Sequence, residues 1–107
     1  MGAVALGMMD RLIEMSTRYA AERRQFGKPI GEQQLVQAML ADMKCDQLTS
    51  EALVERVAAR FDAGRSSQLE AAALKYVATE AVGRVADRAV QIHGGAGYMA
   101  EYKVERF

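Results

Sequence analysis

Three short stretches of the sequence carry side chains and glycines suited to binding an anionic ligand. They are AERRQFGKPIG at residues 21–31, EQQ at residues 32–34 and QIHGGAGY at residues 91–98. Arg23 and Arg24 supply permanently charged, planar donors that match phosphate oxygens. Gly94 and Gly95 let the main chain come close to a flat or anionic group, because neither carries a Cβ atom. Together the three stretches could hold the pyrophosphate of a nucleotide.

Other features of these stretches leave that interpretation open. The amides of Gln33, Gln34 and Gln91 both donate and accept hydrogen bonds, and a helix beginning near Glu32 would add free backbone N–H groups. However, the glycine run follows a helical segment, whereas the glycine motifs of dinucleotide and P-loop sites follow a strand. Glycine and arginine also gather at helix ends in any bundle, so these residues alone do not decide between a ligand site and ordinary helix ends.

The composition fits one small intracellular domain over residues 1–107. Of the 107 residues 50% are hydrophobic, which is enough to fill a single core. Lys plus Arg equals Asp plus Glu at 14 each, so no bulk charge draws the chain to nucleic acid or to a membrane surface. The apolar start is interrupted by Asp10 and Arg11, and no later run approaches a membrane-spanning length. We expect a soluble, cytoplasmic domain.

The single cysteine and the single histidine limit redox and metal chemistry. Cys45 cannot form an internal disulfide, and one Cys with one His is too few for a protein metal site, so we expect no bound metal. Cys45 is expected to be buried midway along a helix. It should therefore be unable to form a nucleophilic dyad with His93.

The regular elements that must position these residues are helices. Ala, Leu, Met, Glu, Gln and Arg fill long stretches with a single proline, which favours helix formation. Apolar residues recur every three or four positions from Ala5 to Tyr19, which predicts a helix over residues 3–24. Two glycines and Pro29 then predict a loop over residues 27–31.

The same spacing predicts a second and longest helix, with its apolar stripe from Val36 to Phe61 and its end at the C-capping signal Gly64. Two polar side chains, Gln47 and Ser50, interrupt this stripe. They form either a buried hydrogen-bonding pair or a sector that faces solvent or another subunit, and we favour the second interpretation.

A third helix follows. Ser67 and Glu70 match a capping box, and an apolar stripe from Leu74 to Ile92 leads to the terminating glycines. Short connections make neighbouring helices antiparallel, so the predicted fold class is all-α. We expect an up-down bundle of three long helices plus a short C-terminal segment, with the fourth helix missing. The three anion-binding stretches should then meet at one end of the bundle.

Two segments resemble the C-terminal helical domain of the acyl-CoA dehydrogenases: YAAERRQFGKPIGEQQ at residues 19–34 and AVQIHGGAGYMAEYKVERF at residues 89–107. Together with the two long helices between them, they extend the resemblance over essentially the whole chain. It implies a flavoprotein oxidoreductase of fatty acid metabolism. Such an enzyme removes a proton and a hydride from the α and β carbons of an acyl-CoA thioester, and FAD takes the hydride. Electrons then leave through an electron-transfer flavoprotein, in the cytoplasm or, in a eukaryote, in the mitochondrial matrix.

The resemblance also implies contacts with the FAD of a neighbouring subunit. Arg23 would meet the pyrophosphate, Gln25 and Phe26 would flank it, and Gln34 would assist. Gln33 stands where the family often carries an aromatic ring.

At the other end of the chain, Gln91, Gly94 and Gly95 would line the adenosine part. The family assigns no catalytic duty to the position of His93, so we expect a packing role there. The family's general base lies outside the segments matched, so the chain is expected to be an inactive fragment, and we assign no catalytic residue.

The missing fourth helix predicts a homo-oligomer, because the apolar groove that it leaves is normally covered by another copy. Two other classes of function stay open. A non-catalytic helical oligomerisation module would have the same stripes, but it would not need Arg23, Gln34 and the paired glycines to meet. A nucleic-acid-binding relative would need a basic face, which the balanced charge opposes.

Overall fold

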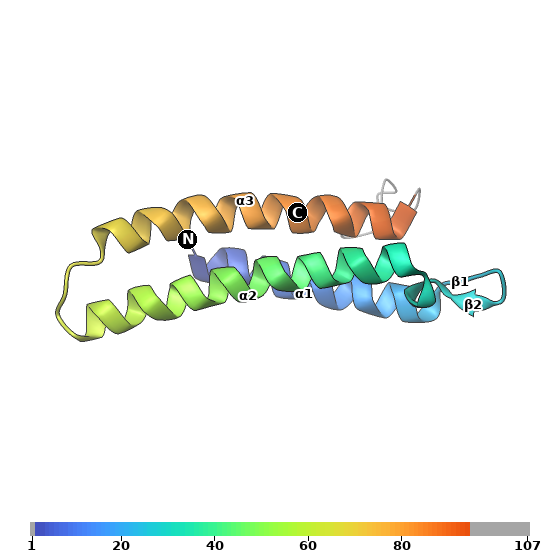
Figure 1. Cartoon of the computed structure of the whole chain (residues 1–107), viewed down its shortest axis with the longest axis horizontal. Coiled ribbons are helices and arrows are strands. Elements are labelled where there is room, and N and C mark those ends of the chain that lie inside the picture. The colour runs from blue at the N-terminus through green and yellow to red at the C-terminus, as the bar shows by residue number, and fades with distance from the viewer. Residues whose placement is uncertain (1, 95–107) are drawn as a thin grey trace.

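The computed structural model describes residues 2–94 as three long helices and a small β-hairpin. The elements are α1 (Gly2–Glu22), β1 (Arg24–Gln25), β2 (Lys28–Pro29), the 3-10 turn η1 (Ile30–Glu32), α2 (Gln34–Asp62) and α3 (Gln68–His93). The helices run along the long axis in alternating directions (Figure 1). The hairpin and the C-terminal end of α3 lie at one end, and the α2–α3 connection lies at the other. The predicted all-α up-down bundle is confirmed, and Gly95 and the segment EYKVERF lie outside the described residues.

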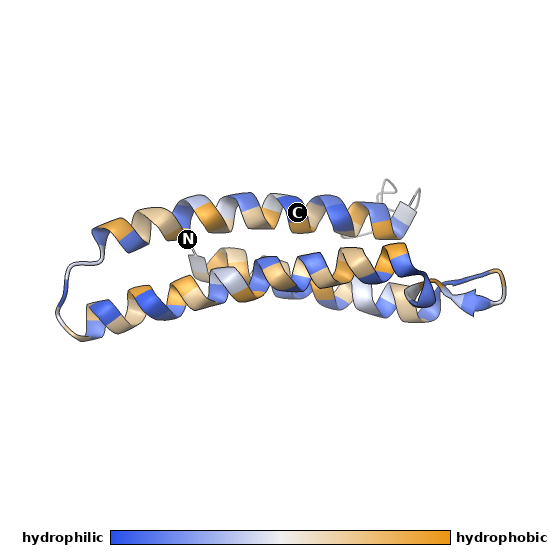
Figure 2. Ribbon diagram, viewed as in Figure 1, coloured by the Kyte–Doolittle hydropathy of each residue, from blue (hydrophilic) through white to orange (hydrophobic). Residues whose placement is uncertain are grey.

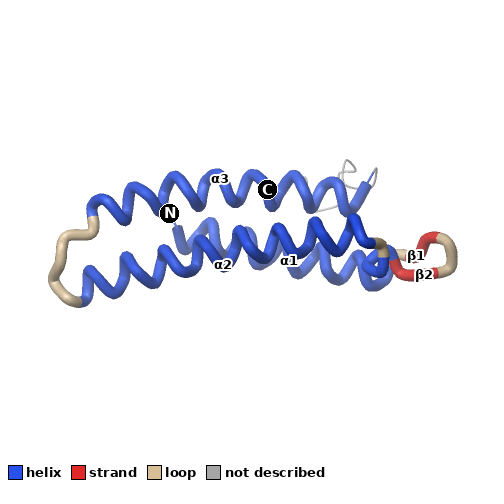
Figure 3. Tube along the Cα trace, viewed as in Figure 1, coloured by secondary structure: helices blue, strands red, loops and turns tan. Residues whose placement is uncertain are grey.

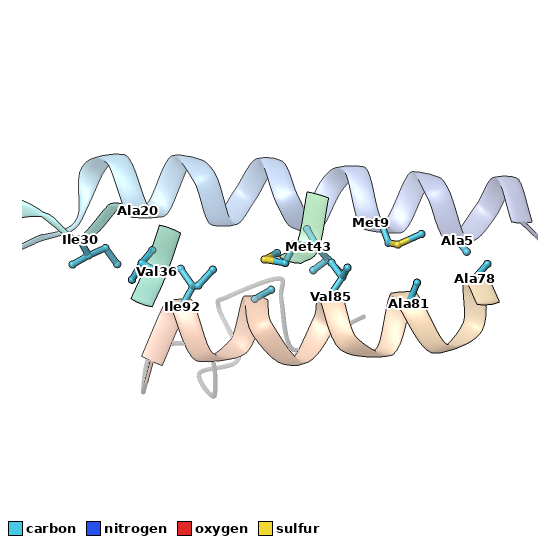
Figure 4. Close-up of a cluster of buried hydrophobic side chains, with 12 residues drawn as sticks. Ala5, Met9, Ala20, Ile30, Val36, Met43, Ala78, Ala81, Val85 and Ile92 are labelled. Atoms are coloured by element: carbon cyan, nitrogen blue, oxygen red, sulfur yellow. The ribbon is translucent and has the colours of Figure 1, made fainter. Parts of the chain in front are cut away.

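The core follows the spacing seen in the sequence. Hydrophobic and hydrophilic residues alternate along all three helices, whereas the strands of the hairpin are hydrophilic (Figure 2). Met9 from α1, Met43 from α2 and Val85 from α3 point into the space between the helices (Figure 4), and all three are fully buried. The three helices therefore pack apolar side chains against one another, which is the main source of stability in such a bundle. The predicted stripe of α2 is wrong at its C-terminal end, because α2 buries Val36 and Met43 while Phe61 is 76% exposed.

The predicted loop over residues 27–31 is wrong in detail, because the chain folds there into a hairpin (Figure 3). Arg24 pairs with Pro29 and Gln25 with Lys28. Between the strands, Phe26 and Gly27 have φ angles of 56° and 79°, as in the two-residue turns that suit hairpins. α1 ends at Glu22 instead of near residue 24, because the next residues leave the helix to form β1.

The end of α2 confirms the capping role of Gly64, which has a φ of 70°. Its N–H donates to the carbonyl of Phe61 at 3.0 Å, and the N–H of Arg65 donates to Arg60 at 2.9 Å. These two bonds form a Schellman motif, in which glycine is favoured because the left-handed conformation costs it little.

The predicted capping box at the start of α3 is wrong. Ser67 occupies the N-cap position, but its side chain makes no capping hydrogen bond. Glu70 is drawn instead to two arginines of α2, with its carboxylate 3.4 Å from Arg60 and 3.7 Å from Arg56. An ion pair between helices has therefore replaced the local bond that the sequence pattern suggested.

The surface assignment of Gln47 and Ser50 is also wrong, since both are buried. The amide of Gln47 donates to the carboxylate of Asp10 on α1, which lets a polar side chain sit between two helices. Cys45 was expected inside but is exposed, because it lies on the opposite side of α2 from the buried stripe.

Ion pairs also join α2 to α3 along the surface. Arg84 contacts Asp46 at 2.9 Å, and Arg88 lies 3.6 Å from both Asp42 and Asp46. The hydrogen bond with Asp46 raises the pKa of Arg84 above its ordinary value. Exposed ion pairs of this kind stabilise a fold only slightly. Their main effect is therefore on how α3 is aligned along α2, and their contribution to the stability of the fold is small.

Within residues 2–94, no helix is both long and apolar enough to cross a membrane. The same part of the chain contains no group of three His, Cys, Asp or Glu side chains that could hold a metal ion.

Candidate functional site

A cavity of about 570 Å³ opens where the hairpin, the start of α2 and the end of α3 come together. Its polar lining is Arg23, Gln25, Gln33, Gln91 and Gly94, and the remaining wall is Tyr19, Ile30, Leu35, Val36, Met39, Ile92 and His93. Arg23 and Gly94 are far apart in the sequence yet line the same cavity. The prediction that the three stretches meet at one end of the bundle is therefore confirmed for the described residues.

The main chain of Arg23 is held at both of its polar groups. Its N–H donates to the carbonyl of Tyr19 at 2.8 Å, and its carbonyl accepts from the N–H of Ile30 at 2.8 Å. Its side chain is exposed, and no ion pair or side-chain hydrogen bond engages it among residues 2–94. The backbone hydrogen bonds fix the main chain of Arg23, and among the described residues nothing occupies its guanidinium, which can therefore bind a ligand.

Arg24 differs from its neighbour because its guanidinium is already engaged. It donates from Nη2 to the carbonyl of Gly27 at 2.7 Å, across the turn of the hairpin. This bond braces the turn that carries Phe26, whose side chain is 92% exposed. Phe26 lines a smaller cavity of about 240 Å³ on the hairpin instead of the main one. The two arginines that the sequence offered equally as phosphate ligands therefore have different roles.

The start of α2 places two adjacent glutamines differently. Gln33 is the N-cap residue, lines the cavity and donates from Nε2 to Oε1 of Gln25 at 3.1 Å. Gln34, the first residue of the helix, is exposed and does not line this cavity. The resemblance implied Gln34 as a cofactor contact, and that assignment stays a prediction. No sequence pattern indicated the bond between Gln33 and Gln25, because it depends on how the hairpin packs against the start of α2.

The inner wall of the cavity is built by aromatic packing. His93 is buried, its Nδ1 donates to the carbonyl of Ala89 at 2.8 Å, and its ring centroid lies 4.3 Å from that of Tyr19. These contacts agree with the packing role expected for His93.

At the end of α3 the N–H of Gly94 donates to the carbonyl of Gln91, and Gly94 has a φ of 56°. A ligand can therefore come close to the main chain at Gly94, but the N–H of Gly94 is already engaged and is not a free donor for it. Gln91 lines the cavity with an exposed side chain.

Comparison with known proteins gives a consistent result. The family model described as "Acyl-CoA dehydrogenase, C-terminal domain" matches residues 1–107. Acryloyl-CoA reductase (NADH) of Anaerotignum propionicum is 44% identical over 105 residues, which cover 98% of this chain and 27% of the reductase.

Two solved structures are similar as well. Butyryl-CoA dehydrogenase from Megasphaera elsdenii matches with a TM-score of 0.94 and 38% identity, covering 98% of this chain and 27% of that one. An acyl-CoA dehydrogenase complexed with FAD from Bacillus anthracis matches with a TM-score of 0.90 and 33% identity, covering 98% and 21%. The chain thus spans about a quarter of the length of the relatives it matches.

Proposed function

Because this chain belongs to the acyl-CoA dehydrogenase family through its C-terminal domain, we propose that it is the helical domain of an FAD-dependent dehydrogenase of acyl-CoA thioesters. The observation that carries the proposal is the single cavity shared by Arg23, Gln25, Gln91 and Gly94. FAD held by these residues would supply the acceptor for the hydride that leaves the β carbon of the thioester. The residues of this chain hold the nucleotide part of the cofactor, and an electron-transfer flavoprotein accepts the electrons. No described residue is proposed as the catalytic base.

The cavity has the chemistry that a pyrophosphate requires. None of the described residues that line it is acidic, and the guanidinium of Arg23 has no carboxylate partner among them. A cation left unneutralised beside amide donors attracts an anion and forms charge-assisted hydrogen bonds with it. Gly94 adds a point where a flat group can approach the main chain without meeting a Cβ atom. The residues present therefore fit the nucleotide end of FAD.

The hairpin supports a site completed by another subunit. Phe26 stands at its tip with a side chain that is 92% exposed, in a positive-φ conformation that is uncommon for a residue other than glycine. A large exposed ring held in a strained turn is often a contact residue. We propose that the tip reaches the flavin nucleotide of a neighbouring copy.

Replacing Arg23 with alanine should weaken binding of ADP and FAD to this chain by at least about tenfold, since a hydrogen bond to a charged group contributes roughly 1.5–3 kcal/mol. Isothermal titration calorimetry on the 107-residue chain measures this. Arg65→Ala is the matched control, because Arg65 is also exposed but lines a different cavity on α2. Equal affinities for the unchanged chain and Arg23→Ala would contradict the proposal and favour a non-catalytic oligomerisation module.

We also propose that the chain forms a homo-oligomer through its helices. α2 and α3 extend past the first residues of α1, so α1 does not cover the end of the bundle that carries their connection (Figure 1). At that end Phe61 and Leu69 are 76% and 78% exposed. Apolar side chains left uncovered in this way are a common basis of association between copies.

Sedimentation velocity at micromolar concentration should therefore show a dimer or larger species. Phe61→Asp and Leu69→Asp should each weaken association by at least about tenfold, since burying a large apolar side chain contributes roughly 1.5–3 kcal/mol. Thr17→Asp, an exposed change on α1, serves as the control for added charge. A monomer for the unchanged chain would contradict this proposal.

A further inference from the structure

We propose that Gln33 is a positioning residue that turns the amide donors of Gln25 toward an anion in the cavity. The inference rests on the proposed function and adds to it a residue that acts through another side chain. It starts from one contact, in which Nε2 of Gln33 donates to Oε1 of Gln25 at 3.1 Å.

That contact determines which face of the Gln25 amide is presented to the cavity. A glutamine amide has one oxygen, which only accepts, and one nitrogen, which only donates. With the oxygen occupied by Gln33, the two N–H donors of Gln25 remain for a ligand. Turning the amide over would bring two NH₂ groups together and lose the bond. An anion needs donors, so this orientation favours phosphate and the reverse would oppose it.

Gln33 is held firmly enough to impose that orientation. Its N–H donates to the carbonyl of Ile30 at 2.9 Å, and its carbonyl accepts from the N–H of Gln37 at 3.0 Å. Its side chain is half-buried and makes no capping bond to α2, although it occupies the N-cap position. The amide that could have capped the helix is engaged with Gln25 instead.

Gln25 is held as well, because its strand pairs it with Lys28 across the hairpin. Both glutamines line the same cavity as Arg23, whose guanidinium has no partner among residues 2–94. Gln25 and Arg23 therefore share the lining of one cavity, in which no described acidic side chain competes with the ligand. The two glutamines also line the smaller cavity on the hairpin, which Glu32 borders and Arg23 does not.

A double-mutant cycle with ADP as the probe tests the role of Gln33. Gln25→Met and Gln33→Met keep the length of each side chain and remove its amide, and each should weaken ADP binding about fivefold. The double variant should bind no more weakly than Gln25→Met alone, because Gln33 acts only through Gln25. Additive losses would overturn the inference. Gln37→Met, one turn along α2, is the control and should bind as the unchanged chain does.

Nuclear magnetic resonance supplies a signature that a general structural role would not produce. The side-chain ¹⁵N–¹H signals of Gln25 should shift on ADP addition in the unchanged chain and stay in place in Gln33→Met. A thermal melt confirms that both proteins are folded. If ADP binding depends on Arg23 but Gln33→Met binds normally, this inference alone fails. If the unchanged chain does not bind ADP, the inference and the proposed function fail together.

Discussion

Replacing Leu12 with alanine should lower the free energy of unfolding by about 3 kcal/mol, the usual cost of removing a fully buried leucine side chain from a packed core. Leu12 is fully buried on α1, within the cluster that α2 and α3 also build. Two terms make up this loss of stability. One is the free energy gained when the removed apolar atoms leave water, and the other is the cost of the cavity that the substitution leaves in the core. Because domains of this size are stable by only about 5–15 kcal/mol, the change is a large share of the total.

Urea unfolding followed by circular dichroism measures the effect. Leu35→Ala is the matched control, since it removes the same atoms from a side chain that is 71% exposed, and it should cost less than about 1 kcal/mol. Similar losses for the two variants would show that α1 is not packed as described. Arg23, which joins α1 to the hairpin, would then lack its rigid support.

Replacing Ala89 with leucine should destabilise the chain by about 2 kcal/mol and also weaken nucleotide binding. Ala89 is fully buried on α3, and its carbonyl accepts the hydrogen bond from His93. A larger side chain there has no free space, so it must push α3 away from its neighbours. Gln91 and Gly94 follow on the same helix end, so the displacement moves one wall of the cavity away from Arg23.

Two measurements separate these effects. Urea unfolding gives the loss of stability. ADP titration at a temperature well below the thermal unfolding midpoint gives the loss of affinity. We expect ADP to bind about tenfold more weakly, as for the loss of one hydrogen bond to a charged group. Ala72→Leu makes the same change at an exposed position of α3 and should alter neither quantity. A destabilised variant that binds ADP normally would mean that the two walls of the cavity act independently.

The helices could be predicted from the sequence because their signals are local. The spacing of Val36 and Met43 reflects the 3.6-residue turn, and Gly64 ends α2 because its positive φ costs glycine little. The convergence of Arg23 and Gly94 followed from counting helices and from the short connections between them. These inferences needed no knowledge of which side chains touch.

The errors occurred where a second element decides the outcome. Glu70 matched a capping box, but Arg56 and Arg60 on α2 compete for its carboxylate. Gln47 is polar, yet it is buried because Asp10 on α1 accepts its hydrogen bond. All three partners lie on another helix, so no local pattern contains the information.

The sequence by itself determined the helical class, the alternating directions of the helices and the end of the bundle where glycines and arginines gather, because periodicity and chain reversal are properties of short segments. Only the tertiary structure decided that Arg24 braces the hairpin while no side chain of residues 2–94 engages Arg23, and that Gln33 is the glutamine that contacts Gln25. Those assignments depend on distances of a few ångströms between separate elements, which only the packed chain establishes.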